Sequence, residues 1–230
     1  MLLFSHIFFT KEFCIFAEKM NQYINIHTHK EHDGEVAIVS WRIGAEPKPA
    51  TKFLSAGIHP WDAEVLYPTL EALAAELEVV DCVAIGEIGL DKACNIPYEI
   101  QRKVFARQME IASRRGVPII IHCVRAQTEV VAELQKHPTR GVIFHGFIGS
   151  KEQAKELVQR GYYLSFGFGV LRSPKTMEAL RDVPLDNLFL ESDTADSPIE
   201  ELYHKVAKVK NIDIEILKKT IWDNYTKLFR

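Results

Sequence analysis

Two histidines, His27 and His29, stand one residue apart in the apolar run INIHTHK. In an extended segment the side chains at positions i and i+2 point to the same side, so both imidazoles would face one way. Two imidazoles on one face suit a metal ion, because histidine nitrogen is a common metal ligand. His-x-His is a short motif, however, and two solvated or hydrogen-bonded histidines at a strand end explain it equally well. The pair alone leaves both interpretations open.

Five further side chains of the metal-binding type follow apolar runs elsewhere. They are His59 in AGIHPW, Glu87 in GEIGLD, His122 in IIIHC, His145 in VIFH and Asp193 in ESD. Buried imidazoles and carboxylates without partners cost several kcal/mol each, and coordination offsets that cost. Four histidines with two carboxylates are too many for one closed site, but they suit two ions that share a bridging carboxylate at ~3.5–4 Å separation. Such mixed ligands indicate Zn²⁺, Mn²⁺ or Mg²⁺, without choosing among them.

Eight apolar runs of strand length must position these residues. They read YINIHTH, EVAIVSW, TKFLSAGIH, CVAIGE, PIIIHC, GVIFH, YYLSF and NLFLESD. Short, nearly continuous apolar runs are typical of strands covered on both faces in a parallel sheet. Amphipathic helical segments lie between the later runs. We therefore predict an α/β fold, a distorted (β/α)₈ TIM barrel with its active site at the carboxyl ends of the strands.

Helix boundary signals support this alternation. Residues 95–115 predict a helix that ends at Gly116. Ser150 to Gln153 predicts a capping box. Ser173-Pro174 and Ser197-Pro198 each predict an N-cap serine followed by proline at the first helical position.

Two links near the start of the chain do not predict helices. Residues 30–34 are too few, and residues 42–51 contain two prolines. We therefore expect thin helical cover near strands 1–3. No linker or internal repeat divides the chain, so residues 20–230 are predicted to be a single barrel domain. Residues 1–19 lack the features of a signal peptide or a membrane span. They are predicted to be an N-terminal extension of uncertain role, because Met20 directly precedes the first strand, and a helix or strand that covers the bottom of the fold is the alternative.

The composition of the 230 residues, 47% hydrophobic and 26% charged, is that of an ordinary globular protein. A formal net charge of -3 gives no global attraction to a polyanion, so contact with nucleic acid needs a local basic patch or a metal. The four cysteines form no C-x-x-C pair, which predicts reduced thiols in a cytoplasmic protein. Neither a membrane association nor an obligate protein partner is predicted.

The motifs IHTH, GIHPW, GEIGLD, IIIHC, FHGFIGS, YLSFG, ESD and NYTKLF follow one another from about residue 24 to the C-terminus. This ordered set resembles the TatD-like metal-dependent hydrolases of the amidohydrolase superfamily. The resemblance implies a TIM barrel with a binuclear centre and hydrolysis of phosphodiester bonds, commonly as a DNase or 3′ to 5′ exonuclease, in the cytoplasm. In the ligand set it implies, His27, His29 and Asp193 hold one metal, His122 and His145 hold the other, and Glu87 bridges.

Catalytic roles follow from the chemistry of such a centre. A water that bridges two metal ions has its pKa lowered towards neutrality, and Asp193 is our candidate for accepting its proton. His59 is expected to touch the scissile group, although a histidine hydrogen-bonded in a turn before Pro60 is the alternative. Asp91 either orients a ligand or is a simple turn residue. Arg125 is a candidate for binding substrate.

Departures from the family pattern bear on the substrate. The family usually has a basic loop with Asn-Glu-Pro after the ESD-like segment, whereas this chain runs TADSPIEELYHK. The arginine expected close after the strand 5 histidine is displaced by one residue, as Arg125. Fewer basic groups mean fewer phosphate contacts. A small phosphodiester substrate, hydrolysis of another ester, lactone or amide, and a non-catalytic metal-binding scaffold therefore stay open as alternatives to a nuclease. Trp61 could line the pocket or stack against bases, but a packing role is the default.

Overall fold

The computed structural model of the chain contains one sheet of eight parallel strands, paired in sequence order from β1 to β8. The structure describes residues 22–230, so the predicted N-terminal extension lies outside the described residues. The strands are β1 (Tyr23–Thr28), β2 (Glu35–Arg42), β3 (Leu54–Gly57), β4 (Ala84–Asp91), β5 (Ile119–Val124), β6 (Val142–Phe144), β7 (Tyr163–Phe166) and β8 (Leu188–Leu190). The predicted distorted barrel is confirmed.

The barrel is closed at the carboxyl ends of β8 and β1 by backbone hydrogen bonds. The amide of Asp193 donates to the carbonyl oxygen of His27, and the amide of His29 donates to the carbonyl oxygen of Asp193, both at 3.1 Å. Thr28 and Asp193 thereby form a parallel bridge beyond the end of β8. Three predicted metal ligands, His27, His29 and Asp193, thus lie in the two segments that close the barrel.

A side chain completes the pairing of β1 further from this end. The hydroxyl of Tyr203, in helix α8 (Ile199–Lys210), accepts a hydrogen bond from the Ile24 amide at 3.2 Å and donates one to the Ile24 carbonyl oxygen at 2.9 Å. Both residues are fully buried. Because buried backbone groups need partners, this hydroxyl takes the place of a neighbouring strand.

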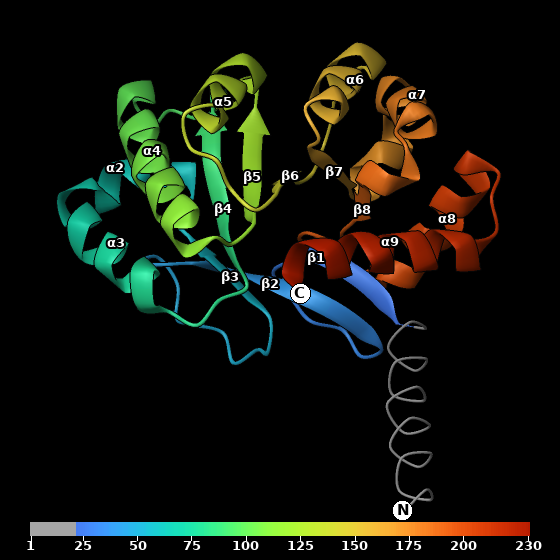
Figure 1. Cartoon of the computed structure of the whole chain (residues 1–230), viewed down its shortest axis with the longest axis horizontal. Helices are drawn as coiled ribbons and strands as arrows, with labels where there is room; N and C mark the ends of the chain where they lie inside the picture. Colours follow the sequence, from blue (N-terminus) through green and yellow to red (C-terminus); the bar gives the residue numbers. More distant parts are fainter. Residues whose placement is uncertain (1–21) are drawn as a thin grey trace, which may run out of the picture.

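Helices surround the outer face of the sheet from β3 onward (Figure 1). Besides α8, they are α2 (Ala63–Leu66), α3 (Leu70–Val79), α4 (Tyr98–Arg115), α5 (Gln127–Leu134), α6 (Lys151–Gln159), α7 (Pro174–Asp182) and α9 (Ile214–Phe229), with 3₁₀ turns at Pro60–Asp62, Tyr67–Thr69, Phe168–Arg172 and Leu185–Asn187. Within residues 22–230 no helix connects β1 to β2 or β2 to β3. The thin cover predicted for this side is confirmed. None of the described helices is long and apolar enough to cross a membrane.

The helix boundaries follow most of the predicted signals. Ser150 and Gln153 form the capping box at the start of α6, and the Ser173 side chain caps α7. Helix α4 begins three residues later than predicted. The N-cap prediction for Ser197 is wrong: Pro198 itself takes the N-cap position of α8, and no side chain caps this helix.

Strands β4 and β5, which carry two predicted ligands, approach each other at a glycine. Gly89 has φ +150° and pairs with His122 in the strand register. A Cβ atom at this position would lie 1.9 Å from the carbonyl oxygen of His122. Only glycine fits here, so its lack of a side chain lets β4 come close to β5.

Candidate metal centre

The barrel brings the predicted ligands to one end, where the strands finish. His27 lies in β1, Glu87 in β4 and His122 in β5, while His29, His59, His145 and Asp193 lie just beyond β1, β3, β6 and β8. A cavity of about 590 Å³ opens here, and six of the seven residues line it. The seventh, His27, is fully buried beneath them. Strands of different parts of the chain thus deliver seven metal-type side chains to one place.

Glu87 is the centre of this group. Its Oε1 atom lies 2.6 Å from His122 Nδ1, 2.7 Å from His145 Nε2 and 3.1 Å from His59 Nε2. Its Oε2 atom lies 3.4 Å from His27 Nε2 and 3.9 Å from His29 Nε2. The two oxygens of one buried carboxylate therefore face two different sets of histidines.

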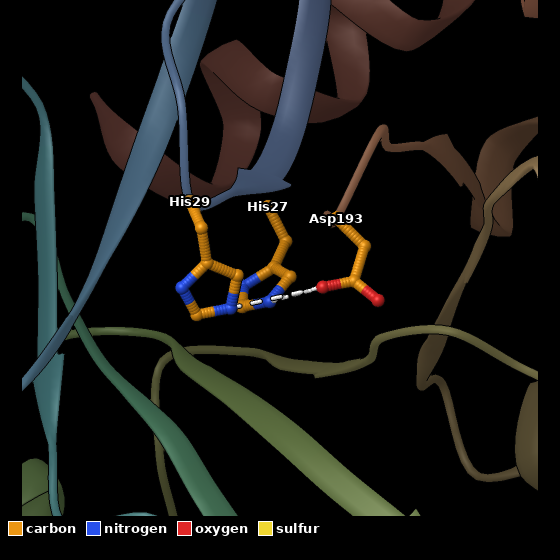
Figure 2. A group of neighbouring side chains, drawn as sticks. All are labelled: His27, His29 and Asp193. Atoms are coloured by element: carbon orange, nitrogen blue, oxygen red, sulfur yellow. Dashed lines mark ion pairs between the residues drawn. The ribbon is translucent and has the colours of Figure 1, made fainter. Parts of the chain in front are cut away.

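His27, His29 and Asp193 form a second group at the β1–β8 junction (Figure 2). Asp193 Oδ1 lies 3.8 Å from His27 Nε2 and 3.7 Å from His29 Nε2. The Asp193 backbone has φ +53°, a left-handed conformation that non-glycine residues rarely adopt. Such strain is tolerated where the surroundings hold a residue in place, and here the bonds to β1 do so.

Three groups of these residues place possible ligand atoms close enough to hold an ion. They are His27–His29–Asp193, His27–Glu87–His145 and His59–Glu87–His122. The first matches the predicted set. The other two differ in detail, because His145 groups with His27, and His59 joins His122.

The donor atoms fit a metal ion. Both ring nitrogens of His27 are buried and have no hydrogen-bond partner. An unpaired buried imidazole is costly, whereas a nitrogen that coordinates a metal is satisfied. Imidazole and carboxylate donors together suit divalent ions such as Zn²⁺ or Mn²⁺.

The electrostatics of the group favour a carboxylate at its centre. Burial raises the pKa of Glu87, but the charge of His145 and the hydrogen bonds from His122 and His145 outweigh burial and hold that pKa well below its usual range. Burial lowers the pKa of His145, but the charges of Glu87 and Glu191 outweigh it and hold that pKa well above the usual value. A metal that binds His145 must therefore displace a proton.

Two carboxylates support the histidines from behind. Asp91 Oδ2 lies 3.2 Å from Nε2 of His122, and Glu191 Oε1 lies 3.3 Å from Nδ1 of His145. Glu191 is completely buried and also accepts a hydrogen bond from the Gly146 amide at 2.7 Å. Glu191 was not predicted from the sequence, although in an extended segment its position two residues before Asp193 would put both side chains on one face.

Trp61 is not a packing residue, contrary to the default interpretation. Its side chain is exposed, at 53% relative accessibility, and lines the cavity that contains the predicted ligands. The short 3₁₀ turn at Pro60–Asp62 projects it there rather than into the core. Its indole Nε1 donates to Asp91 Oδ2 at 2.7 Å, and this bond was not foreseen.

Arg125 lies beside the ligand cavity. It lines an adjacent cavity of about 300 Å³ that also contains Lys92, Gln127 and Gln153 and shares His145 with the central group. Its backbone has φ +53°. Arg125, which is displaced by one residue in the sequence from the expected position, thus lies next to the central group rather than within it.

Fold and site together define a parallel β/α barrel that gathers histidines and carboxylates suited to metal binding at the carboxyl ends of its strands. The TatD related DNase family matches residues 42–230, and the chain belongs to this family. An uncharacterized metal-dependent hydrolase of Escherichia coli is 36% identical over 155 residues, which are 64% of this chain and 60% of that protein. A 3′-5′ ssDNA/RNA exonuclease TatD of Cronobacter turicensis is 34% identical over 168 residues, 68% of this chain and 62% of that protein. The chain thus spans about three fifths of these relatives.

The solved structures show the same architecture. The crystal structure of a TatD homologue from Escherichia coli K12 superposes with a TM-score of 0.75, at 24% identity, over 91% of this chain and 98% of that one. This likeness concerns the fold, and it agrees with the barrel described above.

Proposed function

We propose that this protein hydrolyses phosphodiester bonds with two divalent metal ions held on either side of Glu87. The observation that carries the proposal is the division of the Glu87 oxygens between two sets of histidines, with Oε1 near His122 and His145 and Oε2 near His27 and His29. A carboxylate that binds two ions needs this arrangement. The carboxylate is buried and ionised, so it is ready to receive cations.

The proposed ligands are the residues predicted from the sequence. His27, His29 and Asp193 would hold one ion, His122 and His145 the other, with Glu87 shared between them. When bound, such ions lower the pKa of water and stabilise the charge that develops on a phosphoryl oxygen. The experiment below distinguishes among Zn²⁺, Mn²⁺ and Mg²⁺.

Protein groups near the centre would move the proton and orient the substrate. Asp193 is 42% exposed at its side chain, so it reaches water and can accept a proton while still facing His27 and His29. His59 sits beside Glu87 and His122, where it either contacts the scissile group or adds a ligand. Arg125, in the adjacent cavity, would bind a substrate phosphate.

A nucleic acid strand is the proposed substrate, in line with the DNase family and with the exonuclease relative. The short link between Asp193 and α8 supports a small phosphodiester as the second candidate, because no long basic loop follows Asp193 here. We propose the cytoplasm as the compartment, since Cys82, Cys94 and Cys123 are free thiols in the described residues.

The test combines metal content with turnover. Purified protein is titrated with Zn²⁺, Mn²⁺ and Mg²⁺, and hydrolysis of bis(p-nitrophenyl) phosphate and of a labelled single-stranded DNA is measured. Glu87→Gln and Asp193→Asn should abolish turnover, and Glu201→Gln, an exposed carboxylate on α8, is the matched control. Fewer than about two ions per chain at saturation would refute the binuclear centre. Cleavage of the small diester alone would select the second substrate.

A further inference from the structure

Trp61 is set apart from the other tryptophans of the chain by its exposure. The sequence contains three tryptophans. Trp41 and Trp222 are buried, with relative accessibilities of 5% and 2%, whereas that of Trp61 is 53%. An exposed indole leaves a large apolar surface in water, which burial against a partner would relieve.

The ring of Trp61 is held in a fixed place beside the metal centre. Its Nε1 donates to Asp91 Oδ2 at 2.7 Å, and its backbone amide donates to His59 Nδ1 at 3.1 Å. Its ring centroid lies 4.7 Å from that of His59 and 6.0 Å from that of His122. The indole is therefore anchored at its polar edge, next to two of the histidines around Glu87.

The lining of the central cavity divides into two kinds of surface. Most of the lining residues are polar or charged, and they include five of the six predicted ligands, which would attract a phosphoryl group through bound cations. The apolar members are Trp61 and Pro49. The charged residue Arg42 also lines the cavity, but it already pairs with Asp62. A ligand that fills this space thus presents an anionic group to the centre and an apolar group to Trp61.

We propose that Trp61 binds the substrate by stacking against a nucleobase next to the scissile phosphodiester. The inference rests on the proposed function, and it names the part of the substrate that the protein recognises. Exposed aromatic side chains beside a phosphate site bind single-stranded nucleic acid in this way, because each base has a flat face. A pre-anchored ring loses little conformational entropy when the base arrives.

Trp61 also connects substrate binding to the metal centre. Asp91 Oδ2 accepts from the indole and lies 3.2 Å from His122 Nε2, so one oxygen atom serves both side chains. Asp91 is buried, so its contact with His122 is shielded from water. Trp61 therefore contacts the substrate directly, whereas Asp91 is a positioning residue for the indole and for His122.

The fluorescence of the wild-type protein tests the proposal without any variant. Trp61 is exposed, whereas the other two tryptophans are buried. A ligand that stacks on it in the cavity should therefore quench the fluorescence of Trp61. Deoxyadenosine 5′-monophosphate, added to Zn²⁺-loaded protein, should quench this emission with saturation. Deoxyribose 5-phosphate, which lacks the base, should not. Equal quenching, or no quenching, by the two ligands would overturn the proposal.

Calorimetry with variants measures the size of the effect. Trp61→Ala should weaken binding of deoxyadenosine 5′-monophosphate about 5- to 150-fold, the equivalent of about 1–3 kcal/mol at about 1.4 kcal/mol per tenfold. Trp61→Phe keeps an aromatic ring, so it should bind more tightly than the alanine variant. Tyr67→Ala removes an aromatic side chain from the same region that does not line the cavity, and should bind as the wild type does. Unchanged affinity in Trp61→Ala would refute the stacking role.

The binding assays separate this inference from the proposed function. They need no turnover, so base-dependent quenching in a protein that cleaves no diester would support stacking and remove the hydrolase proposal. Cleavage of DNA with no base-dependent binding would do the reverse. In an active enzyme, Trp61→Ala should raise KM for single-stranded DNA more than it lowers kcat, since the lost contact is to the substrate's base.

Discussion

Removing the charge of Glu191 tests how far the carboxylate behind His145 supports the metal centre. Glu191→Gln keeps the shape of the side chain and an oxygen that can accept from the Gly146 amide, but loses the negative charge 3.3 Å from His145 Nδ1. A carboxylate at that nitrogen makes the opposite ring nitrogen a stronger donor to a metal. In the structure this opposite nitrogen, Nε2, faces Glu87.

The magnitude follows from the charge that is lost, because the Gln oxygen at the same place can still accept from His145 Nδ1. A hydrogen bond to a charged group contributes at most about 3 kcal/mol, so the change in affinity is at most about 150-fold at about 1.4 kcal/mol per tenfold. Changes in the partners of metal-binding histidines typically cost about 10–100-fold, in agreement with this value. We therefore expect Glu191→Gln to weaken metal binding by one to two orders of magnitude.

Competition with a chromophoric chelator measures the change. Zn²⁺ affinity is compared among wild type, Glu191→Gln and the exposed control Glu201→Gln at pH 7.5, and thermal unfolding of the metal-free proteins verifies that each is folded. Affinity of the Gln variant within twofold of the wild type, in a folded protein, would show that Glu191 only fills space. Equal weakening in the control would remove the assignment to His145.

Three further substitutions probe the fold and its pH dependence. Tyr203→Phe leaves the buried amide and carbonyl of Ile24 without partners, at about 1–3 kcal/mol each. Urea unfolding should show a loss of roughly 2–6 kcal/mol, and a negligible loss would mean that the hydroxyl is dispensable. Gly89→Ala places a Cβ against the His122 carbonyl oxygen, so the purified variant should lose its cooperative unfolding or its metal site, and a fully native variant would contradict the close approach. Burial raises the pKa of Glu35 above its usual 4.5, so the folded state is penalised as pH rises through that value. Relative to wild type, Glu35→Gln should therefore gain stability between pH 4 and pH 7.5, measured as urea midpoints, and a pH-independent difference would argue against the shift.

The sequence predicts the barrel well because its signals are local and repeated. Each strand is a short apolar run, and parallel strands must end at the same side of the barrel. The histidines and carboxylates at those ends could therefore be placed together without knowing any packing detail. The two-residue period of a strand was enough to predict that His27 and His29 face the same side. The capping pattern that follows Ser150 was enough to predict the start of a helix there.

Other features depend on contacts between distant segments, which a local pattern does not encode. The exposure of Trp61 results from the short turn after β3 and from a hydrogen bond to Asp91, 30 positions away in the chain. The partner of His145 is Glu191, 46 positions later. Arg125 follows the strand 5 histidine closely, yet its left-handed backbone turns it towards a neighbouring cavity. For these residues the sequence indicated that the residue type could serve a site, but it did not indicate the direction of the side chain.

The hydrogen bonds between β1 and the segment after β8 give the metal centre a place in the folding of the chain. Thr28 and Asp193 are 165 positions apart, and contacts of such long range form late because the intervening chain must first be ordered. His27 and His29 leave the ribosome early but have no Asp193 to face until the last strand has docked. Capture of an ion by this group would therefore report that the ring of strands is complete, and a chain that stops before β8 would lack this proposed ligand group.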